Sequence, residues 1–160
     1  MRRREFITLL SAAAAGPLAA RAQQQGESDP FVGKWLLSLE KSKYNPGPPP
    51  RSASLNIQGE GQNRKATLAG IDAAGNSFTQ VYMFIHDSQP HPVTGNPLGD
   101  AAVYTPVDEN TVGWSVTKDG QIVQTGRDTV SRDGRTFTIT SVRSDASGRP
   151  IGNVAVFDKQ

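Results

Sequence analysis

Apolar and polar residues alternate with a period of two through most of the chain after residue 30. Segment 111–117, for example, is apolar at Val112, Trp114 and Val116 and has Gly, Ser or Thr between and after them. A two-residue period places the apolar side chains on one face of an extended strand, whereas a helix needs a period of about 3.6 residues. No segment of this region has the helical period. The pattern therefore predicts an all-β protein.

Nine segments rich in β-branched and aromatic residues are predicted to be strands. Short turns containing Gly, Asp or Asn separate most of them, and short turns join antiparallel neighbours. A meander of this length leaves exposed edges unless it closes, so the predicted fold is an up-and-down antiparallel meander closed into a small barrel. The nine segments are Val32–Glu40, Ser52–Gln58, Lys65–Ile71, Ser77–His86, Ala101–Val107, Thr111–Thr117, Gln121–Ser131, Arg135–Arg143 and Pro150–Lys159.

Two connections are longer and rich in proline. Residues 41–51 contain four prolines, and residues 87–100 contain three, Pro90, Pro92 and Pro97. Proline fixes the backbone angle φ and has no N–H group to donate to a neighbouring strand. We therefore expect both connections to be loops that take no part in strand pairing.

The first 22 residues have the three-part pattern of a signal peptide. A basic head of three arginines is followed by a modestly apolar stretch from Phe6 to Ala20 and by a small-residue triplet that ends at Ala22. The head resembles a twin-arginine signal, in which Arg3, Arg4 and Phe6 are the recognised residues. An ordinary secretory signal that carries adjacent arginines is the alternative. Both predict export to the periplasm or beyond, the first through transient contact with the twin-arginine export machinery.

The leader divides the chain into a signal peptide at 1–22, a flexible tether at 23–29 and a β-barrel domain at 30–160. Its apolar stretch is too short and too weakly apolar to stay in a bilayer, which needs roughly 20 strongly apolar residues. No stable membrane insertion is therefore expected. Cysteine is absent, so an exported domain without disulfides must be stabilised by its core.

The positive net charge of the chain comes from its leader. Of the 17 basic residues four lie in the first 22 positions, as does one of the 15 acidic residues, which leaves 13 basic and 14 acidic residues and a charge of −1. The basic excess therefore belongs to the export signal. Nucleic acid is not an expected partner.

Three segments resemble the calycins, the lipocalin and fatty-acid-binding barrels. Phe31-Val32-Gly33-Lys34-Trp35 resembles their opening, where Gly-x-Trp starts the barrel. The last strand, 154–159, and the hairpin at 133–139 are similar to those of the fatty-acid-binding branch. The whole pattern, with a loop at Pro92 to Pro97, also resembles a group of small exported bacterial proteins. The resemblance implies a calycin-like barrel and, by analogy, a small apolar ligand. It does not extend to a two-helix lid, because the proline-rich residues 41–51 cannot form one.

Four aromatic residues are expected to line or floor a ligand cavity: Trp35, Tyr82, Trp114 and Phe137. The alternative is that these side chains simply fill the barrel, as they do in small barrels that hold no ligand. An internal cavity would distinguish the two interpretations.

Arg127 is the candidate for binding a ligand carboxylate. A two-residue turn at Asp119-Gly120 would pair Val112 with Arg127 and place the arginine on the inner face with Trp114. A three-residue turn that includes Lys118 shifts the register by one residue and turns Arg127 outward. The sequence leaves both registers open, and an exposed arginine is the more common of the two.

Motifs for catalysis or metal binding are weak. His86 and His91 flank Asp87, but their spacing matches no metal motif and prolines surround His91. No serine lies in a nucleophile elbow or beside a histidine. We expect no metal, no cofactor and no enzymatic activity. The leading hypothesis is a periplasmic barrel that binds a small, largely apolar molecule, with or without a carboxylate. The alternatives are a ligand-free structural or interaction protein of the cell envelope and an unrecognised enzyme.

Overall fold

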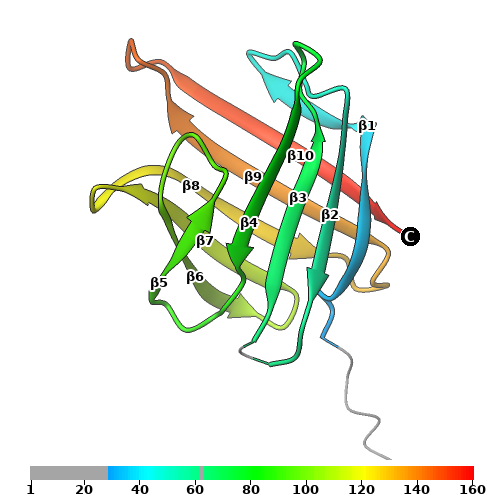
Figure 1. Cartoon of the computed structure of the whole chain (residues 1–160). Coiled ribbons are helices and arrows are strands. Elements are labelled where there is room, and N and C mark those ends of the chain that lie inside the picture. The colour runs from blue at the N-terminus through cyan, green and yellow to red at the C-terminus, as the bar shows by residue number, and fades with distance from the viewer. Residues whose placement is uncertain (1–28, 62) are drawn as a thin grey trace, which may run out of the picture.

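The computed structural model describes residues 29–61 and 63–160, which form a closed barrel of ten antiparallel strands (Figure 1). The all-β barrel is thus confirmed, with one strand more than expected. Among the described residues, no helix is long and apolar enough to cross a membrane. The strands are β1 Gly33–Asn45, β2 Ser52–Gln58, β3 Lys65–Ile71, β4 Ser77–Met83, β5 Pro90–Thr94, β6 Ala101–Asp108, β7 Thr111–Lys118, β8 Gln121–Val130, β9 Thr136–Ser144 and β10 Pro150–Lys159.

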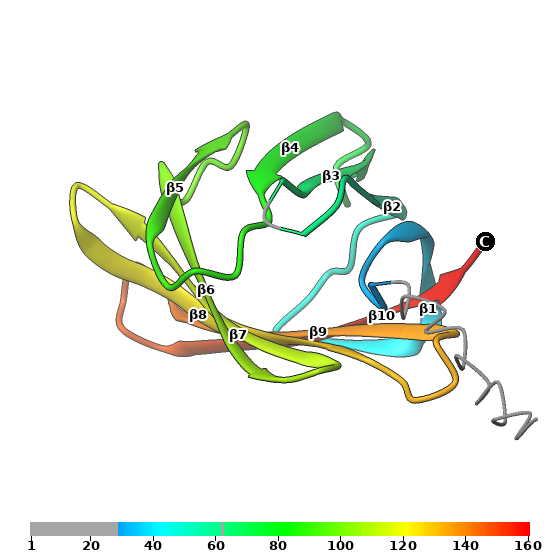
Figure 2. The same cartoon turned by 90° about the horizontal axis from the view of Figure 1, so that it is seen from below.

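The ring closes where the first strand meets the last. Every other strand pairs with its neighbours in sequence, and β1 pairs with both β2 and β10. Trp35, for example, lies opposite Leu55 on β2 and Lys159 on β10. The pairing continues around the whole ring and is shortest between β4 and β5, where two residues of each strand pair. Closure reduces the number of unpaired edges at which another chain could add a strand. Figure 2 looks from below into this ring.

Strand β5 lies within residues 87–100, which were wrongly expected to be an unpaired loop. The amide of Val93 donates a hydrogen bond of 2.8 Å to the carbonyl of Asp100, on the β6 side. Since alternate residues of a strand face opposite neighbours, Pro90 and Pro92 turn their missing N–H groups toward β4. Pairing with β4 involves only the last two residues of β5. The prolines are therefore tolerated because they face the side with little strand pairing.

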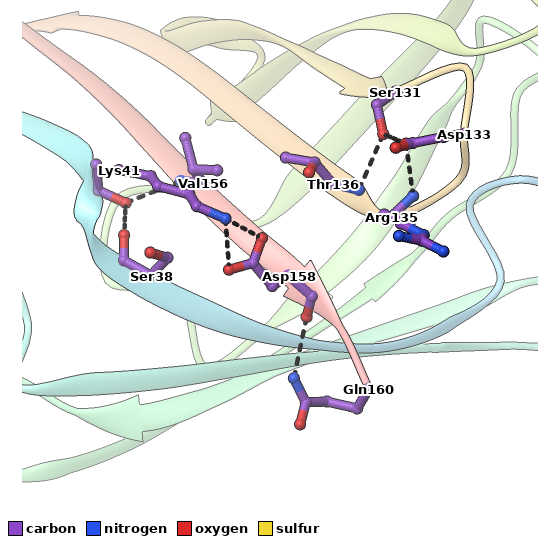
Figure 3. Close-up of polar contacts among 10 residues, drawn as sticks. Ser38, Lys41, Ser131, Asp133, Arg135, Thr136, Val156, Asp158 and Gln160 are labelled. Atoms are coloured by element: carbon purple, nitrogen blue, oxygen red, sulfur yellow. Dashed lines mark hydrogen bonds and ion pairs between the residues drawn. The ribbon is translucent and has the colours of Figure 1, made fainter.

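Strand β1 runs five residues beyond its predicted end at Glu40, and it carries a bulge. The pairing with β10 jumps from Ser38 opposite Val156 to Lys43 opposite Val154, so β1 has extra residues at this point. The Ser42 hydroxyl donates to the carbonyl of Ser38 at 2.6 Å and accepts from the amide of Val156 at 2.9 Å. Figure 3 shows this seam. The bulge bends the strand, and the Ser42 hydroxyl bonds one backbone group of each strand at this point.

The two ends of the barrel are built differently. The end near residue 31, here called the closed end, gathers the first described residues and the connections 59–64 and 84–89 (Figure 1). The opposite end, here called the open end, gathers the proline-rich connection 46–51 and the β5–β6 connection 95–100. A ligand would enter a barrel of this kind through its less filled end.

Aromatic rings fill the closed end. Trp35 is 1% exposed and packs edge to face on Phe137, with ring centroids 5.3 Å apart. Phe31 contacts Phe84 and Phe137 at 5.5 and 6.0 Å, and its carbonyl accepts a 3.1 Å hydrogen bond from Trp35 Nε1. Such edge-to-face packing of large rings excludes water and stabilises this end of the barrel.

An ion pair fixes the start of the described chain to this cluster. Arg64 is buried, and its Nη1 lies 2.6 Å from Asp29 Oδ2. The other carboxylate oxygen of Asp29 accepts a hydrogen bond from the amide of Phe31. Asp29, which the sequence analysis placed in the tether, is therefore part of the closed end. The predicted signal peptide and the rest of the predicted tether lie outside the described residues.

Candidate ligand cavity

A partly open cavity of about 310 Å³ lies inside the barrel. It begins above the aromatic rings of Phe84 and Phe137 and extends to Tyr44, Pro50 and residues 96–98 at the open end. Tyr44 follows the bulge in β1, so the bend described above helps to place this side chain at the cavity. Its volume lies at the lower end of the range for small-molecule sites, roughly 300 to 1,000 Å³.

The cavity wall is mostly apolar and carries no basic side chain. Aliphatic residues such as Leu55, Ile57 and Leu68 line one side, and aromatic residues line much of the rest. Among the lining residues, all within the described ranges, there is no Lys, Arg or His, and Asp128 is the one acid. The chemistry of the site therefore depends on an isolated carboxyl group in apolar surroundings.

Asp128 is held on β8 by a hydrogen bond from the next strand. Its side chain is buried, with the residue 5% exposed, and Oδ1 accepts a 2.7 Å hydrogen bond from Trp114 Nε1 on β7. The other oxygen, Oδ2, makes no hydrogen bond to any described residue. Burial raises the pKa of Asp128 to about 7, although the hydrogen bond from Trp114 opposes the shift. The group therefore changes its charge near neutral pH.

Gly126 makes the approach of Trp114 possible. It lies opposite Trp114 in the β7–β8 pair and two residues before Asp128, hence on the same face. A Cβ at position 126 would lie 2.2 Å from Cζ2 of the indole and 2.2 Å from the carbonyl oxygen of Thr140. No side chain fits there. The indole therefore lies across a glycine, which lets its Nε1 reach Asp128.

Two tyrosines add hydroxyl groups to the cavity. Tyr82 Oη donates to Gln80 Oε1 at 2.6 Å and accepts from Asn96 Nδ2 at 3.2 Å, which connects β4 to the β5–β6 connection. Burial raises the pKa of Tyr82 to about 12. Tyr104 is 6% exposed, and its Oη makes no hydrogen bond to any described residue. Burial, with Asp128 nearby, raises the pKa of Tyr104 well above its usual value.

The structure places three of the five predicted site residues at the cavity: Tyr82, Trp114 and Phe137. Trp35 is buried, but it belongs to the aromatic cluster of the closed end and does not line the cavity. Arg127 is exposed and points away from the interior. The choice of Arg127 as a ligand-binding residue is therefore wrong, and the structure has the outward orientation, the more common of the two that the sequence left open. No arginine among the described residues lines the cavity for a ligand carboxylate.

A single extra residue explains the position of Arg127. The turn at Asp119-Gly120 is the two-residue turn considered from the sequence, because Lys118 pairs with Gln121. A bulge follows, since Thr117 pairs with Ile122 and Val116 with Gln124, which leaves Val123 without a partner. The bulge reverses the faces of β8 beyond it. Asp128, opposite Val112, takes the inward place that a two-residue turn without the bulge would give to Arg127.

Sequence reasoning therefore missed Asp128, although a signal for it exists. Val130 is an apolar residue near the end of β8 and is 1% exposed. Counting back from Val130 by twos selects Asp128, Gly126 and Gln124 as inward positions, whereas counting forward from the turn crosses the bulge and selects Arg127. The apolar end of a strand is the better reference point when a bulge lies near the turn.

The histidines do not form a metal site in this part of the chain. His86 packs on Phe84 at 4.6 Å, and burial together with nearby Arg64 lowers the pKa of His86 to about 4. His91 Nε2 lies 3.0 Å from Asp87 Oδ1 in a separate surface pair. Among residues 29–61 and 63–160, no three His, Cys, Asp or Glu side chains come close enough together to hold a metal ion.

Comparison with known proteins informs the fold. No protein-family model matches the chain, and no curated protein does. Among solved structures, the zebrafish ileal bile acid-binding protein in complex with cholic acid is similar over 82% of this chain and 99% of its own, with a TM-score of 0.52 and 16% sequence identity. At this identity the similarity concerns the fold alone. The chain thus forms a closed, ten-stranded antiparallel barrel with a calycin-like fold.

Proposed function

We propose that the protein is exported by the twin-arginine route to the periplasm, where its barrel binds a small, largely apolar molecule. The observation that carries the binding part is the cavity of about 310 Å³ with its largely apolar wall. A bile acid-binding protein has the same kind of fold, which supports the idea that such a barrel can hold an apolar ligand. The leader residues Arg3 and Arg4 support the export part.

The polar groups of the cavity favour this proposal over a barrel that is merely filled. A filled interior stabilises a protein best when every buried polar group has a partner. Here Asp128 and Tyr104 line the cavity, and neither Asp128 Oδ2 nor Tyr104 Oη makes a hydrogen bond to a described residue. Groups of this kind fix the orientation of a bound molecule in an otherwise apolar site.

The proposal is tested with the cleaved protein purified from the periplasm of the cells that make it. We expect native mass spectrometry to show a retained small molecule that denaturation releases. We also expect saturable binding of the neutral dye Nile red, which becomes fluorescent in apolar surroundings. Leu68→Trp places an indole in the cavity and should weaken dye binding about tenfold or more. Thr67→Trp, the neighbouring outward position, is the control and should bind like the parent.

Two results would count against a ligand site. One is a native mass equal to that of the bare chain together with no saturable dye binding. The other is equal weakening by Leu68→Trp and Thr67→Trp, which would place the dye on the outside of the barrel. Either result would favour a structural or interaction role in the envelope.

A further inference from the structure

The charge of the cavity is one-sided. In the part of the chain that the structure describes, Asp128 is the one acid that lines the cavity, and no basic side chain lines it. Arg64 and His86, at the closed end, do not line it either. A ligand that enters this space therefore meets a carboxyl group with no basic partner among residues 29–61 and 63–160.

The carboxyl group is only half satisfied. Trp114 Nε1 donates to Oδ1, and no described residue donates to Oδ2. A buried carboxylate is costly unless it is paired with a cation and hydrogen-bonded at both oxygens. A charged amine on a ligand would supply both the missing hydrogen bond and the missing positive charge.

We propose that the ligand is an apolar molecule with a cationic amine, whose N–H group donates to Asp128 Oδ2. The apolar part would lie along the aliphatic and aromatic wall of the same cavity. This inference rests on the proposed function, because it names the class of molecule that the cavity binds. It replaces the carboxylate ligand expected from the sequence.

Asp128 should interact differently with three kinds of ligand head group: an amine, an alcohol and a carboxylic acid. An ammonium group is attracted by the ionised carboxylate, and a hydroxyl group can donate to it without a gain in charge pairing. A ligand carboxylate is repelled by it, and no lining arginine or lysine compensates. The cavity should therefore prefer an amine to an alcohol and an alcohol to an acid when the apolar chains are equal.

The preference should depend on pH in a direction that identifies the head group. The titratable groups near Asp128 are Tyr104 on β6 and Tyr82 on β4, and both stay protonated because their pKa values are raised. On the strands that pair with β8, the partners are Trp114 on β7 and Ile139 on β9, which do not titrate. Since the pKa of Asp128 is about 7, this group alone should govern the change between pH 5 and 8.

The experiment displaces Nile red from the cleaved protein with decylamine, decanol or decanoic acid at pH 5, 6, 7 and 8. The amine stays protonated throughout, so its affinity should rise about tenfold per pH unit below 7 and level off above it. The acid stays ionised at pH 6 and above, so its affinity should fall as the pH rises from 6 to 8. Asp128→Asn keeps the shape of the side chain and should weaken amine binding at pH 8 by about tenfold to a hundredfold.

Decanol binding by Asp128→Asn shows that this variant still folds and keeps its cavity. Arg127→Ala is the matched control, because it removes the charged side chain next in sequence on the outer face, and it should bind decylamine like the parent. The inference is overturned if the acid binds better than the amine, or if Asp128→Asn binds the amine as well as the parent does. Absence of all dye binding by the parent would instead refute the proposed function.

Discussion

Trp114 and Asp128 are joined across strands β7 and β8 by a 2.7 Å hydrogen bond from the indole N–H to a carboxylate oxygen. One partner is a large aromatic ring on the cavity wall, and the other is the one acid of that wall. The ring thus satisfies one oxygen of the acid, while the cavity side of the acid stays available. The stability of the barrel and the chemistry of its cavity therefore depend on the same carboxyl group.

We expect Asp128→Asn to be more stable than the parent at pH 8. In the folded protein the pKa of Asp128 is about 7, against 3.8 for a free side chain, so between these values the folded state keeps a proton that the unfolded chain has lost. This contribution to stability is complete below about pH 4 and is lost as the pH rises through 7. Asp128→Asn has no titrating group at this position, so it does not lose this stability as the pH rises. Its free energy of unfolding should therefore exceed that of the parent by about 2 to 4 kcal/mol at pH 8.

His86 changes the stability of the protein with pH in the opposite direction. Its pKa is lowered from 6.5 to about 4, so the unfolded chain binds a proton that the folded state does not, and stability rises with pH over this range. The two groups oppose each other in the parent. Urea unfolding from pH 4 to 8 should give a shallow profile for the parent and a rising one for Asp128→Asn. Parallel profiles would show that Asp128 titrates normally.

Gly126→Ala should displace Trp114 from its place above Asp128. The new Cβ would meet both the indole and the carbonyl of Thr140 at 2.2 Å, so the backbone or the ring has to move. Overpacking of this kind costs about 1 to 3 kcal/mol. Thermal unfolding and tryptophan emission measure the two effects. Gly113→Ala on β7 is the control, because its nearest atoms lie at 3.9 Å, and a similar loss in both variants would contradict the steric argument.

Trp35→Ala should destabilise the closed end by about 3 to 5 kcal/mol, because it removes a ring that is 1% exposed and leaves a cavity beside Phe137. Urea unfolding of the cleaved protein measures the loss. Leu36→Ala, at the neighbouring position that is 48% exposed, should change the stability by less than about 1 kcal/mol. Comparable losses in the two variants would argue against the closed end as a main source of stability.

Replacing both Arg3 and Arg4 with lysine should trap the precursor in the cytoplasm, since the paired arginines are the feature that distinguishes this leader from an ordinary secretory signal. Fractionation followed by immunoblotting measures precursor and cleaved protein in each compartment. Changing Arg2 alone to lysine is the matched control and should leave export intact. Normal export of the double variant would assign the leader to the ordinary secretory route.

The sequence predicted the barrel well because its information is local. Alternation marks each strand, and short turns make neighbours antiparallel, so the order of strands around the ring follows directly. Strand β5 was not predicted, because prolines lack the N–H group that strand pairing uses. They are compatible because Pro90 and Pro92 turn their missing N–H groups toward β4, which pairs only with Val93 and Thr94 of β5. The position of the neighbouring strand determines this property, and the segment itself does not.

The candidate site was harder to predict, since it depends on register. The cavity aromatics Tyr82, Trp114 and Phe137 were found because each lies in a regular part of its strand. Asp128 was missed because the bulge at Val123 exchanges the inner and outer faces of the rest of β8. The residues around Val123 carry no sequence signal that predicts this bulge. One inserted residue thus determines which side chain faces the cavity: Arg127, which would suit an acidic ligand, or Asp128, which suits an amine.

The pairing of β1 with β10 also determines when the barrel can close during synthesis. Lys41 and Asp158, which form an ion pair between these two strands, are 117 positions apart in the chain. Their strands cannot pair until the ribosome has made β10, which follows the other nine strands, and contacts this distant slow the search for the native state. The nine other strand pairs form between neighbours in sequence, so an unfinished chain is an open sheet with two unpaired edges. The synthesis of β10 therefore allows the open sheet to close into a ring.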